Sequence, residues 1–204
     1  MSYVFLGFSL GLSAGLAPGP LLALVIQRTL QHGVASGLRI ALAPLLTDLP
    51  IVLLALFVIS RLPPVYLHGL MAAGGLFVLW LAFDAWRTTD QALTEPPAPP
   101  AVHQDLLRGM MVNFLNPHPY LFWGTIGAPL VIQAWGEHPG YAAGFILAFY
   151  FLLIGSKMAL ALILGRVRQM PPQIYRRLMQ FSALLLLIAG GMMLYSAWQG
   201  FMAS

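Results

Sequence analysis

Long apolar segments alternate with short polar connections along the whole chain, and this pattern predicts an α-helical membrane protein. Each segment reaches about 20 residues, the length that a helix needs to cross the hydrocarbon core of a bilayer. We expect six spanning helices, at Tyr3–Ile26, Leu38–Ser60, Tyr66–Trp86, Leu107–Ile132, Tyr141–Gly165 and Leu178–Phe201. The fold class that follows is all-α, with residues 1–204 forming a single membrane domain.

Two of these segments are interrupted by proline doublets. The first segment contains Pro18-Gly19-Pro20 and the fourth contains Pro117-His118-Pro119. Proline lacks an amide proton and disfavours helix in the residue before it, so each doublet should break its helix and free backbone carbonyls and amides. Hydrocarbon cannot satisfy these groups, and membrane proteins tolerate them only inside protein or along a wet cavity. Paired breaks in the two halves of a chain therefore indicate the substrate site of a transporter.

Composition supports the membrane assignment and excludes several other classes. Hydrophobic residues make up 59% of the chain and charged residues 8%, whereas soluble domains carry about 25% charged residues. The absence of cysteine excludes disulfides and thiolate metal sites. No spacing typical of a metal site or a phosphate-binding loop occurs, so we expect no metal and no cofactor. The net charge of +4 lies in the connections and implies no nucleic-acid partner.

The basic residues predict how the chain is oriented. Eight of the ten lie in the first, third and fifth connections, whereas the even connections hold only Arg61. By the positive-inside rule, the odd connections face the cytoplasm and both termini face outward, in the cell (inner) membrane. No Lys or Arg precedes the first apolar segment, so we expect a retained first helix rather than a signal peptide.

Landmarks recur in the same order in the two halves, which predicts an internal repeat. Pro18-Gly19-Pro20 corresponds to Pro117-His118-Pro119, and Ala73-Gly74-Gly75 corresponds to Ala189-Gly190-Gly191. We therefore divide the domain into repeats 1–86 and 107–204, joined by a proline-rich cytoplasmic linker at 87–106. Because each repeat holds three spans, the second must enter the membrane from the opposite side. The expected architecture is two inverted three-helix repeats with broken first and fourth helices.

Glycines follow one another at four-residue spacing in the first segment, at Gly7, Gly11, Gly15 and Gly19. This spacing leaves one stripe of the helix without side chains, so another backbone can approach it closely. We expect the stripe to serve helix packing within the monomer, and a dimer interface is the alternative.

Two charged residues lie inside the apolar segments and are the first candidates for function. Asp48 is near the centre of the second segment, where an ionised carboxylate costs at least about 2.5–3.5 kcal/mol. It can bind a proton or a substrate amine, and the alternative is a structural ion pair or cap. Lys157 is the one basic residue away from the predicted helix ends. It either pairs with Asp48 or extends its side chain toward the cytoplasmic interface.

Polar side chains beside the second break complete the candidate site. Asn113 and Asn116 carry amides that can bond a carboxylate, an ammonium group or freed backbone. His118 lies between two prolines and can relay protons near neutral pH, or simply occupy a helix turn.

The chain resembles one transporter family over essentially its whole length. The likeness rests on Gly15–Pro20, then Gly33, Gly37 and Asp48, and on Asn113–Pro117 followed by Leu121 and Phe122. These motifs resemble those of the lysine exporter (LysE/RhtB-type) translocators. The resemblance implies a small six-helix inner-membrane protein that exports amino acids and related metabolites with the proton gradient. It also implies that Pro18-Gly19-Pro20 is the first broken-helix motif, and that Asn113, Asn116 and Pro117 form the second.

Two departures from the family pattern bear on the substrate. His118 stands where the family often has lysine, and Pro44–Pro50 is rich in proline where the family is commonly rich in glycine.

We therefore expect a secondary transporter, not an enzyme, that exports small amino acids or related metabolites and is coupled to protons. Its partners would be a small-molecule substrate and membrane lipid, and a homo-oligomer is compatible with the sequence. Asp48 and His118 would form the proton relay. The residues predicted for substrate binding and translocation are Pro18, Gly19, Pro20, Asp48, Asn113, Asn116, Pro117 and Lys157.

Two other functions remain open at this point. A transporter of metal ions or other cations would surround its ion with Asp48, Asn113, Asn116 and backbone oxygens. An intramembrane enzyme would need Ser9, His118 and Asp48 to converge as a triad.

Overall fold

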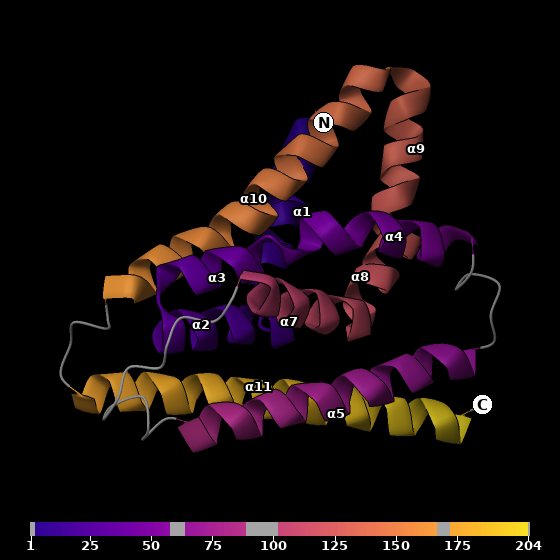
Figure 1. Cartoon of the computed structure of the whole chain (residues 1–204). Coiled ribbons are helices and arrows are strands. Elements are labelled where there is room, and N and C mark those ends of the chain that lie inside the picture. Colours follow the sequence, from indigo (N-terminus) through magenta and orange to yellow (C-terminus); the bar gives the residue numbers. More distant parts are fainter. Residues whose placement is uncertain (1–2, 58–63, 89–101, 167–171, 204) are drawn as a thin grey trace.

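The computed structural model describes residues 3–57, 64–88, 102–166 and 172–203, and these residues are almost all helical, with no strand among them. Most of the expected linker 87–106 lies outside the described residues. The elements, shown in Figure 1, are α1 (Tyr3–Leu16), α2 (Pro20–His32), α3 (Val34–Ala41), α4 (Ala43–Phe57), α5 (Pro64–Thr88), α7 (Val102–Leu115), α8 (Pro117–Phe122), the π-helix η2 (Trp123–Gly127), α9 (Ala128–Glu137), α10 (Pro139–Gly165) and α11 (Pro172–Ala203).

Within the described residues, four helical stretches are long and apolar enough to cross a membrane singly. Helices α1 and α2, which meet at a 62° bend, form a fifth candidate if the pair counts as one span. The four single candidates are Val34–Leu54, His68–Arg87, Pro139–Gly165 and Arg176–Met202. The all-α membrane fold expected from the sequence is therefore present, with four to five candidate spans.

The expected span Leu107–Ile132 is not a continuous helix. It is divided among α7, α8, η2 and α9, and it is absent from the candidate spans of the described chain. The count of six spans and the inverted repeat stay predictions.

Both proline doublets interrupt the helices that contain them. Gly19 is extended, with φ −164° and ψ 175°, and Pro20 occupies the first position of α2. At the second break, Asn116 is extended and its side-chain oxygen accepts a hydrogen bond from the His118 amide, 3.2 Å away. Proline suits the first turn of a helix because the missing amide proton would have no partner there. The same residues therefore end one helix and start the next.

Helix α2 turns into α3 at Gly33, whose φ of 92° is the one positive value among the described residues. Only glycine adopts this conformation without a steric penalty. The reversal brings the two helices side by side.

Helix α1 packs along α10, and α5 packs along α11 (Figure 1). Gly7, Gly11 and Gly15 are buried against α10, and a Cβ at Gly7 would lie 2.5 Å from the Phe145 carbonyl oxygen. The glycine stripe therefore serves packing within the monomer at these three positions, as expected. Gly19 lies at the break and takes no part in this contact.

Replacing Gly11 by Ala is expected to destabilise the α1–α10 pair. A Cβ at Gly11 would meet the backbone carbonyl of Phe149, which cannot give way unless α10 shifts. Overpacking of this kind lowers the free energy of unfolding by about 1–3 kcal/mol. Gly155→Ala on α10 is the matched control, because a Cβ there meets nothing within 4 Å. Thermal unfolding in detergent should show only Gly11→Ala melting earlier, and equal melting of the two variants would contradict the close approach.

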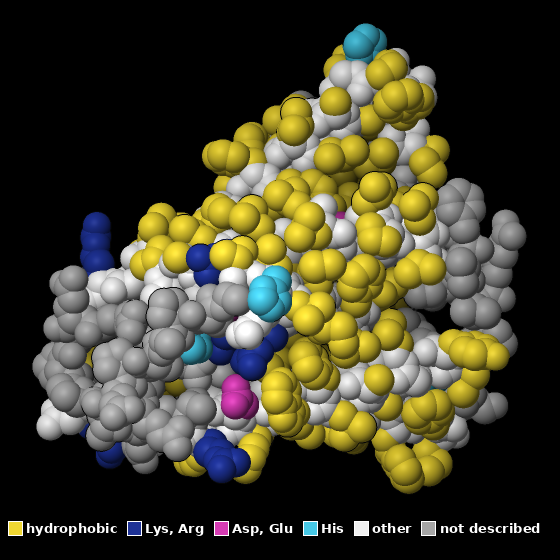
Figure 2. Space-filling view, viewed as in Figure 1, with side chains coloured by type: hydrophobic (Ala, Val, Ile, Leu, Met, Phe, Trp, Pro, Cys, Tyr) yellow, Lys and Arg dark blue, Asp and Glu magenta, His cyan; other side chains and the backbone are white. Residues whose placement is uncertain are grey.

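The helix ends that the odd connections join lie together on the left of Figure 1. They are the α2–α3 turn, the ends of α5 and α10, and the beginnings of α7 and α11. Lys and Arg side chains gather in the left half of Figure 2, whereas hydrophobic side chains cover most of the remaining described surface in that view. The described arginines on these helices are Arg28, Arg39, Arg87, Arg108, Arg166, Arg176 and Arg177. The arginines of the described chain are therefore concentrated at one end of the helices.

Candidate functional site

The two helix breaks face a common cavity of about 250 Å³. Its volume is just below the range of about 300–1,000 Å³ that is usual for ligand pockets, which suits a small solute. Among the residues predicted for the site, those that line the cavity are Pro18, Gly19, Pro20, Asp48, Asn113, Asn116, His118 and Lys157. Pro117 is buried at the first position of α8 and is not part of the lining.

Asp48 lies on α4 with 4% of its surface exposed, and both of its carboxyl oxygens accept hydrogen bonds. Oδ1 accepts from the Asn113 amide nitrogen at 2.9 Å, and Oδ2 accepts from the Tyr150 hydroxyl at 2.9 Å. Asn113 also donates to the Thr47 hydroxyl at 2.6 Å. Because these partners are uncharged, the carboxyl is held in place without being neutralised.

Lys157 lies on α10 with 3% of its surface exposed, so its side chain is buried within the protein. Its ammonium group donates to the carbonyl oxygens of Gly15 and Ala14, at 2.9 and 3.3 Å. These carbonyls lie in the last turn of α1, where the helix dipole is negative and the break leaves acceptors without helical partners. The lysine therefore satisfies backbone groups that the first break frees.

Asp48 and Lys157 do not form an ion pair with each other in the described structure; Asp105 and Asp84 are the acidic partners of the ion pairs there. The cavity thus receives a carboxyl group from α4 and an ammonium group from α10, each bonded to neutral partners. A solute that carries both charges can complement both groups.

Residues at the start of α2 also line the cavity. They are Pro20, Leu21 and Leu22, preceded by Gly19, and Leu21 and Leu22 carry the first backbone N–H groups of the helix because proline has none. The first amides of a helix have no partner within the helix, and together with the dipole they favour an anion. The first break therefore places two helix ends at the cavity. The end of α1 is rich in hydrogen-bond acceptors, which Lys157 binds, and the start of α2 is rich in donors.

His118 is exposed and lines the cavity beside the second break. Its backbone amide is bonded to Asn116. Its side chain is thus not buried, and its relay role stays a prediction.

Ser9 does not join the other members of the triad that an enzyme would need. Its hydroxyl donates to the Phe5 carbonyl at 2.9 Å, and the residue is exposed on α1 and absent from the cavity lining that includes Asp48 and His118. Residues 3–57, 64–88, 102–166 and 172–203 also hold no group of three or more His, Cys, Asp or Glu side chains that could hold a metal ion.

Two aromatic residues of the site were not predicted from the sequence. Tyr150 binds Asp48 directly, and Trp123, which lines the cavity, interacts with the same carboxyl. Trp123 starts the π-helix η2, and π-helical turns often occur at functional sites. Gly127 makes room for its ring, because a Cβ there would lie 2.5 Å from it. Aromatic residues are common in apolar segments, so nothing in the sequence marked these two.

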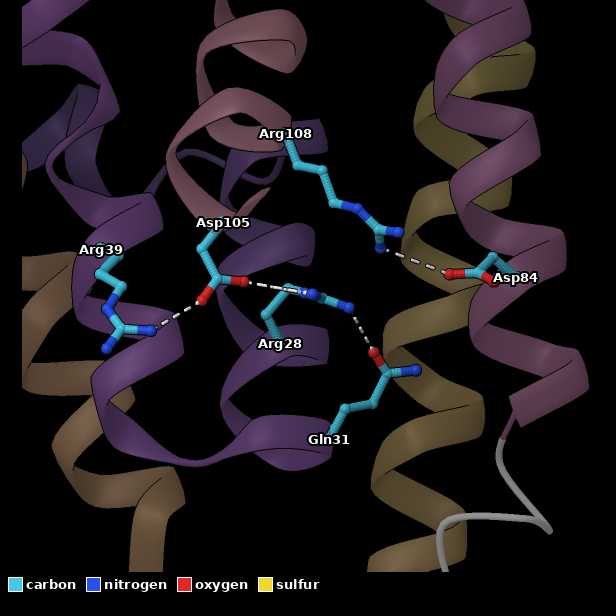
Figure 3. A network of polar contacts seen from close by, with 6 residues as sticks. All are labelled: Arg28, Gln31, Arg39, Asp84, Asp105 and Arg108. Atoms are coloured by element: carbon cyan, nitrogen blue, oxygen red, sulfur yellow. Dashed lines mark hydrogen bonds and ion pairs between the residues drawn. The ribbon is translucent and has the colours of Figure 1, made fainter. Parts of the chain in front are cut away.

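A buried ionic network at the arginine-rich end was also not predicted (Figure 3). Asp105 is fully buried in the first turn of α7. It pairs with Arg28 of α2 at 3.1 Å and with Arg39 of α3 at 3.3 Å. Beside it, Arg108 of α7 pairs with Asp84 of α5 at 3.6 Å. The network ties three helices of the first half of the chain to α7.

The helices, the paired breaks and the cavity between them are those of a multi-pass membrane transporter. Residues 12–197 match the model of the LysE type translocators, and the chain belongs to this family. The resemblance inferred from the sequence motifs is thus confirmed.

Curated relatives match most of the chain. The arginine exporter protein ArgO of Salmonella paratyphi A is 29% identical over 179 residues, which cover 82% of each chain. ArgO of Salmonella choleraesuis is 29% identical over 184 residues, covering 85% of each. An uncharacterized membrane protein of Pseudomonas aeruginosa is 28% identical over 159 residues, covering 74% of this chain and 70% of its own. No solved structure matches the chain.

Proposed function

We propose that this protein is a secondary transporter that exports small zwitterionic amino acids or close derivatives, coupled to protons. The observation that carries the proposal is the pair of opposite charges, Asp48 and Lys157, which line one cavity at a helix break without pairing with each other. Membership of the translocator family and relatives named as arginine exporters support amino-acid export.

In the mechanism that we propose, the substrate spans the two charges. Its ammonium group binds the Asp48 carboxylate, and its carboxylate binds near Lys157 and the first amides of α2. Rocking of one half of the chain against the other would expose the loaded cavity to the outside. A proton that enters from the outside and reaches Asp48 would then neutralise the carboxylate and release the amine, and the protonated carrier would return to the inward-facing state.

The cation-transporter alternative has less support. Hard cations take six or more oxygen ligands with several carboxylates among them. Among the described residues, Asp48 is the one acidic residue that lines the cavity, and Asn113 already donates to it through its amide nitrogen.

The export function can be tested in cells that lack their own exporters. Expression of the protein should restore growth under an excess of single amino acids or dipeptides, and flux into proteoliposomes should follow for each solute found. Asp84→Asn, which leaves the cavity lining unchanged, serves as the matched control for site variants. Failure of every amino acid to be transported by folded, reconstituted protein would contradict the proposal.

The breaks themselves are expected to be required for transport. Replacing both Pro18 and Pro20 by Ala should favour a continuous helix and remove the carbonyls that Lys157 binds. We expect flux to fall roughly a hundredfold, which is the loss typical of a misplaced binding group. The protein should still insert into the membrane. Pro129→Ala, at an exposed position in the first turn of α9, is the control. Wild-type flux in the double variant would remove the breaks from the mechanism.

We propose that the arginine-rich helix ends face the cytoplasm and that both termini face outward. A reporter fused within Glu95–Pro100 should then read as cytoplasmic, and one fused after Ser204 as external. Single cysteines offer a second readout because the chain has none of its own. A membrane-impermeant maleimide should label Gly136→Cys but not His103→Cys in intact cells. Reversed labelling would overturn the orientation.

A further inference from the structure

The charges around the cavity are balanced before a substrate enters. In the described chain, the lining carries one carboxyl group, Asp48, and one ammonium group, Lys157, with His118 as the remaining titratable side chain. An amino acid with a neutral side chain can pair its ammonium group with Asp48 and its carboxylate with Lys157, so each charge of the lining has one partner. A substrate with a cationic side chain brings a second positive charge for which the lining offers no second carboxylate.

The cavity wall beside Asp48 is aromatic. Phe122 and Phe149 stack with ring centroids 5.0 Å apart and planes 9° from parallel, and Trp123 meets Phe149 edge-on at 5.6 Å. All three line the cavity. Such a surface favours an apolar or aromatic group. A guanidinium can stack on an aromatic face, but the rings supply no acceptors for its five N–H donors.

The apolar surroundings continue beyond this wall. Trp123 also borders a second cavity of about 320 Å³, together with Tyr150, the hydroxyl donor to Asp48. Apart from these two rings, the second cavity is lined by aliphatic side chains of α4, α9 and α10, which are Leu45, Leu49, Val52, Ala128, Val131, Ile132 and Ile146. The described residues that line this second cavity include no charged side chain. The cavity therefore offers no anionic partner to a cationic group.

From these observations we infer that the substrates are amino acids with neutral, apolar or aromatic side chains, which bind against Phe122, Trp123 and Phe149, and that amino acids with cationic side chains are excluded. The inference rests on the export function proposed above and specifies its substrate. It separates this chain from the relatives that are named as arginine exporters.

Counterflow with the full-length protein in liposomes tests the inference. Vesicles loaded with unlabelled leucine, phenylalanine, alanine, arginine or lysine are placed in a trace of the same labelled amino acid. We expect leucine and phenylalanine to exchange roughly tenfold faster than arginine or lysine, or more. A tenfold difference in the dissociation constants of the amino acids would produce this ratio. Arginine exchange as fast as leucine exchange would overturn the inference alone. Absence of exchange for all five would overturn both the inference and the export function.

A pair of variants tests the charge balance with a gain of activity, which misfolding cannot produce. Phe122→Glu places a carboxylate in the aromatic wall, and Phe122→Gln has the same shape without the charge. We expect arginine exchange to rise roughly tenfold or more in Phe122→Glu relative to Phe122→Gln. Equal arginine exchange in the two variants, with leucine exchange retained, would overturn the charge argument. If both variants fail to fold, the wild-type comparison decides.

Discussion

Asp48→Asn is expected to abolish net proton-driven export while exchange of substrate across the membrane at matched pH survives. The amide keeps the shape of the protonated carboxyl but cannot take up or release a proton. It can still accept a hydrogen bond from a substrate amine, so exchange, which needs no proton, persists. We expect net proton-driven flux to fall roughly a hundredfold, which corresponds to about 2.7 kcal/mol. Flux measured with and without a pH gradient distinguishes the two activities.

The contacts of Asp48 predict that this variant folds. Lys157 donates to the carbonyls of Gly15 and Ala14 and does not depend on Asp48 for a partner. Asp48→Asn should therefore express and melt like the wild type. If it loses folded protein instead, and Lys157→Met restores both folding and transport, then the two residues act as a structural pair. Full proton-driven export by well-folded Asp48→Asn would contradict both roles.

Asp105→Asn is expected to have the largest effect on stability. Removing this carboxylate leaves Arg28, which is 4% exposed, buried without its anionic partner. Breaking a buried ion pair from one side costs about 3–5 kcal/mol, a large share of the stability of a small protein. We expect a clear loss of folded protein and a lower melting temperature in detergent.

The neighbouring ion pair provides the matched control for this variant. Asp84 and Arg108 have side chains that are 32% and 29% exposed, so water and salt screen their interaction. Pairs of this kind contribute about 0–1 kcal/mol. Asp84→Asn should therefore melt close to the wild type. Equal melting of Asp84→Asn and Asp105→Asn would show that burial of the Asp105 network does not stabilise the fold.

Features of the site that depend on local chemistry could be predicted from the sequence. Pro18-Gly19-Pro20 and Pro117-His118-Pro119 break their helices because proline restricts the backbone wherever it stands. Asp48 and Lys157 were recognisable because ionisable residues are rare in apolar segments. The sequence alone left open whether these two pair with each other, because that depends on how α4 and α10 are placed in space.

Features that depend on tertiary contacts could not be predicted. Asp105 lies in a polar connection, where charged residues are common and give no signal of burial. It becomes buried only because α7 packs against α2 and α3. Tyr150 belongs to an apolar segment in which aromatic residues are common. The division of Leu107–Ile132 into several helices was anticipated at the prolines alone, because hydropathy carries no signal for the π-helix η2.

Substrate protection of a single cysteine in the cavity tests the central claim most directly. The chain has no cysteine, so Ala17→Cys gives one reactive thiol among the residues that line the cavity. Gly136→Cys, at an exposed position of α9 outside the cavity lining, gives the matched control. We predict that a transported amino acid slows alkylation of Ala17→Cys, that the half-effect falls at the concentration that half-saturates transport, and that Gly136→Cys is unaffected. Alkylation of Ala17→Cys that no transported solute slows, in a variant that still transports it, would contradict a substrate site at the helix break.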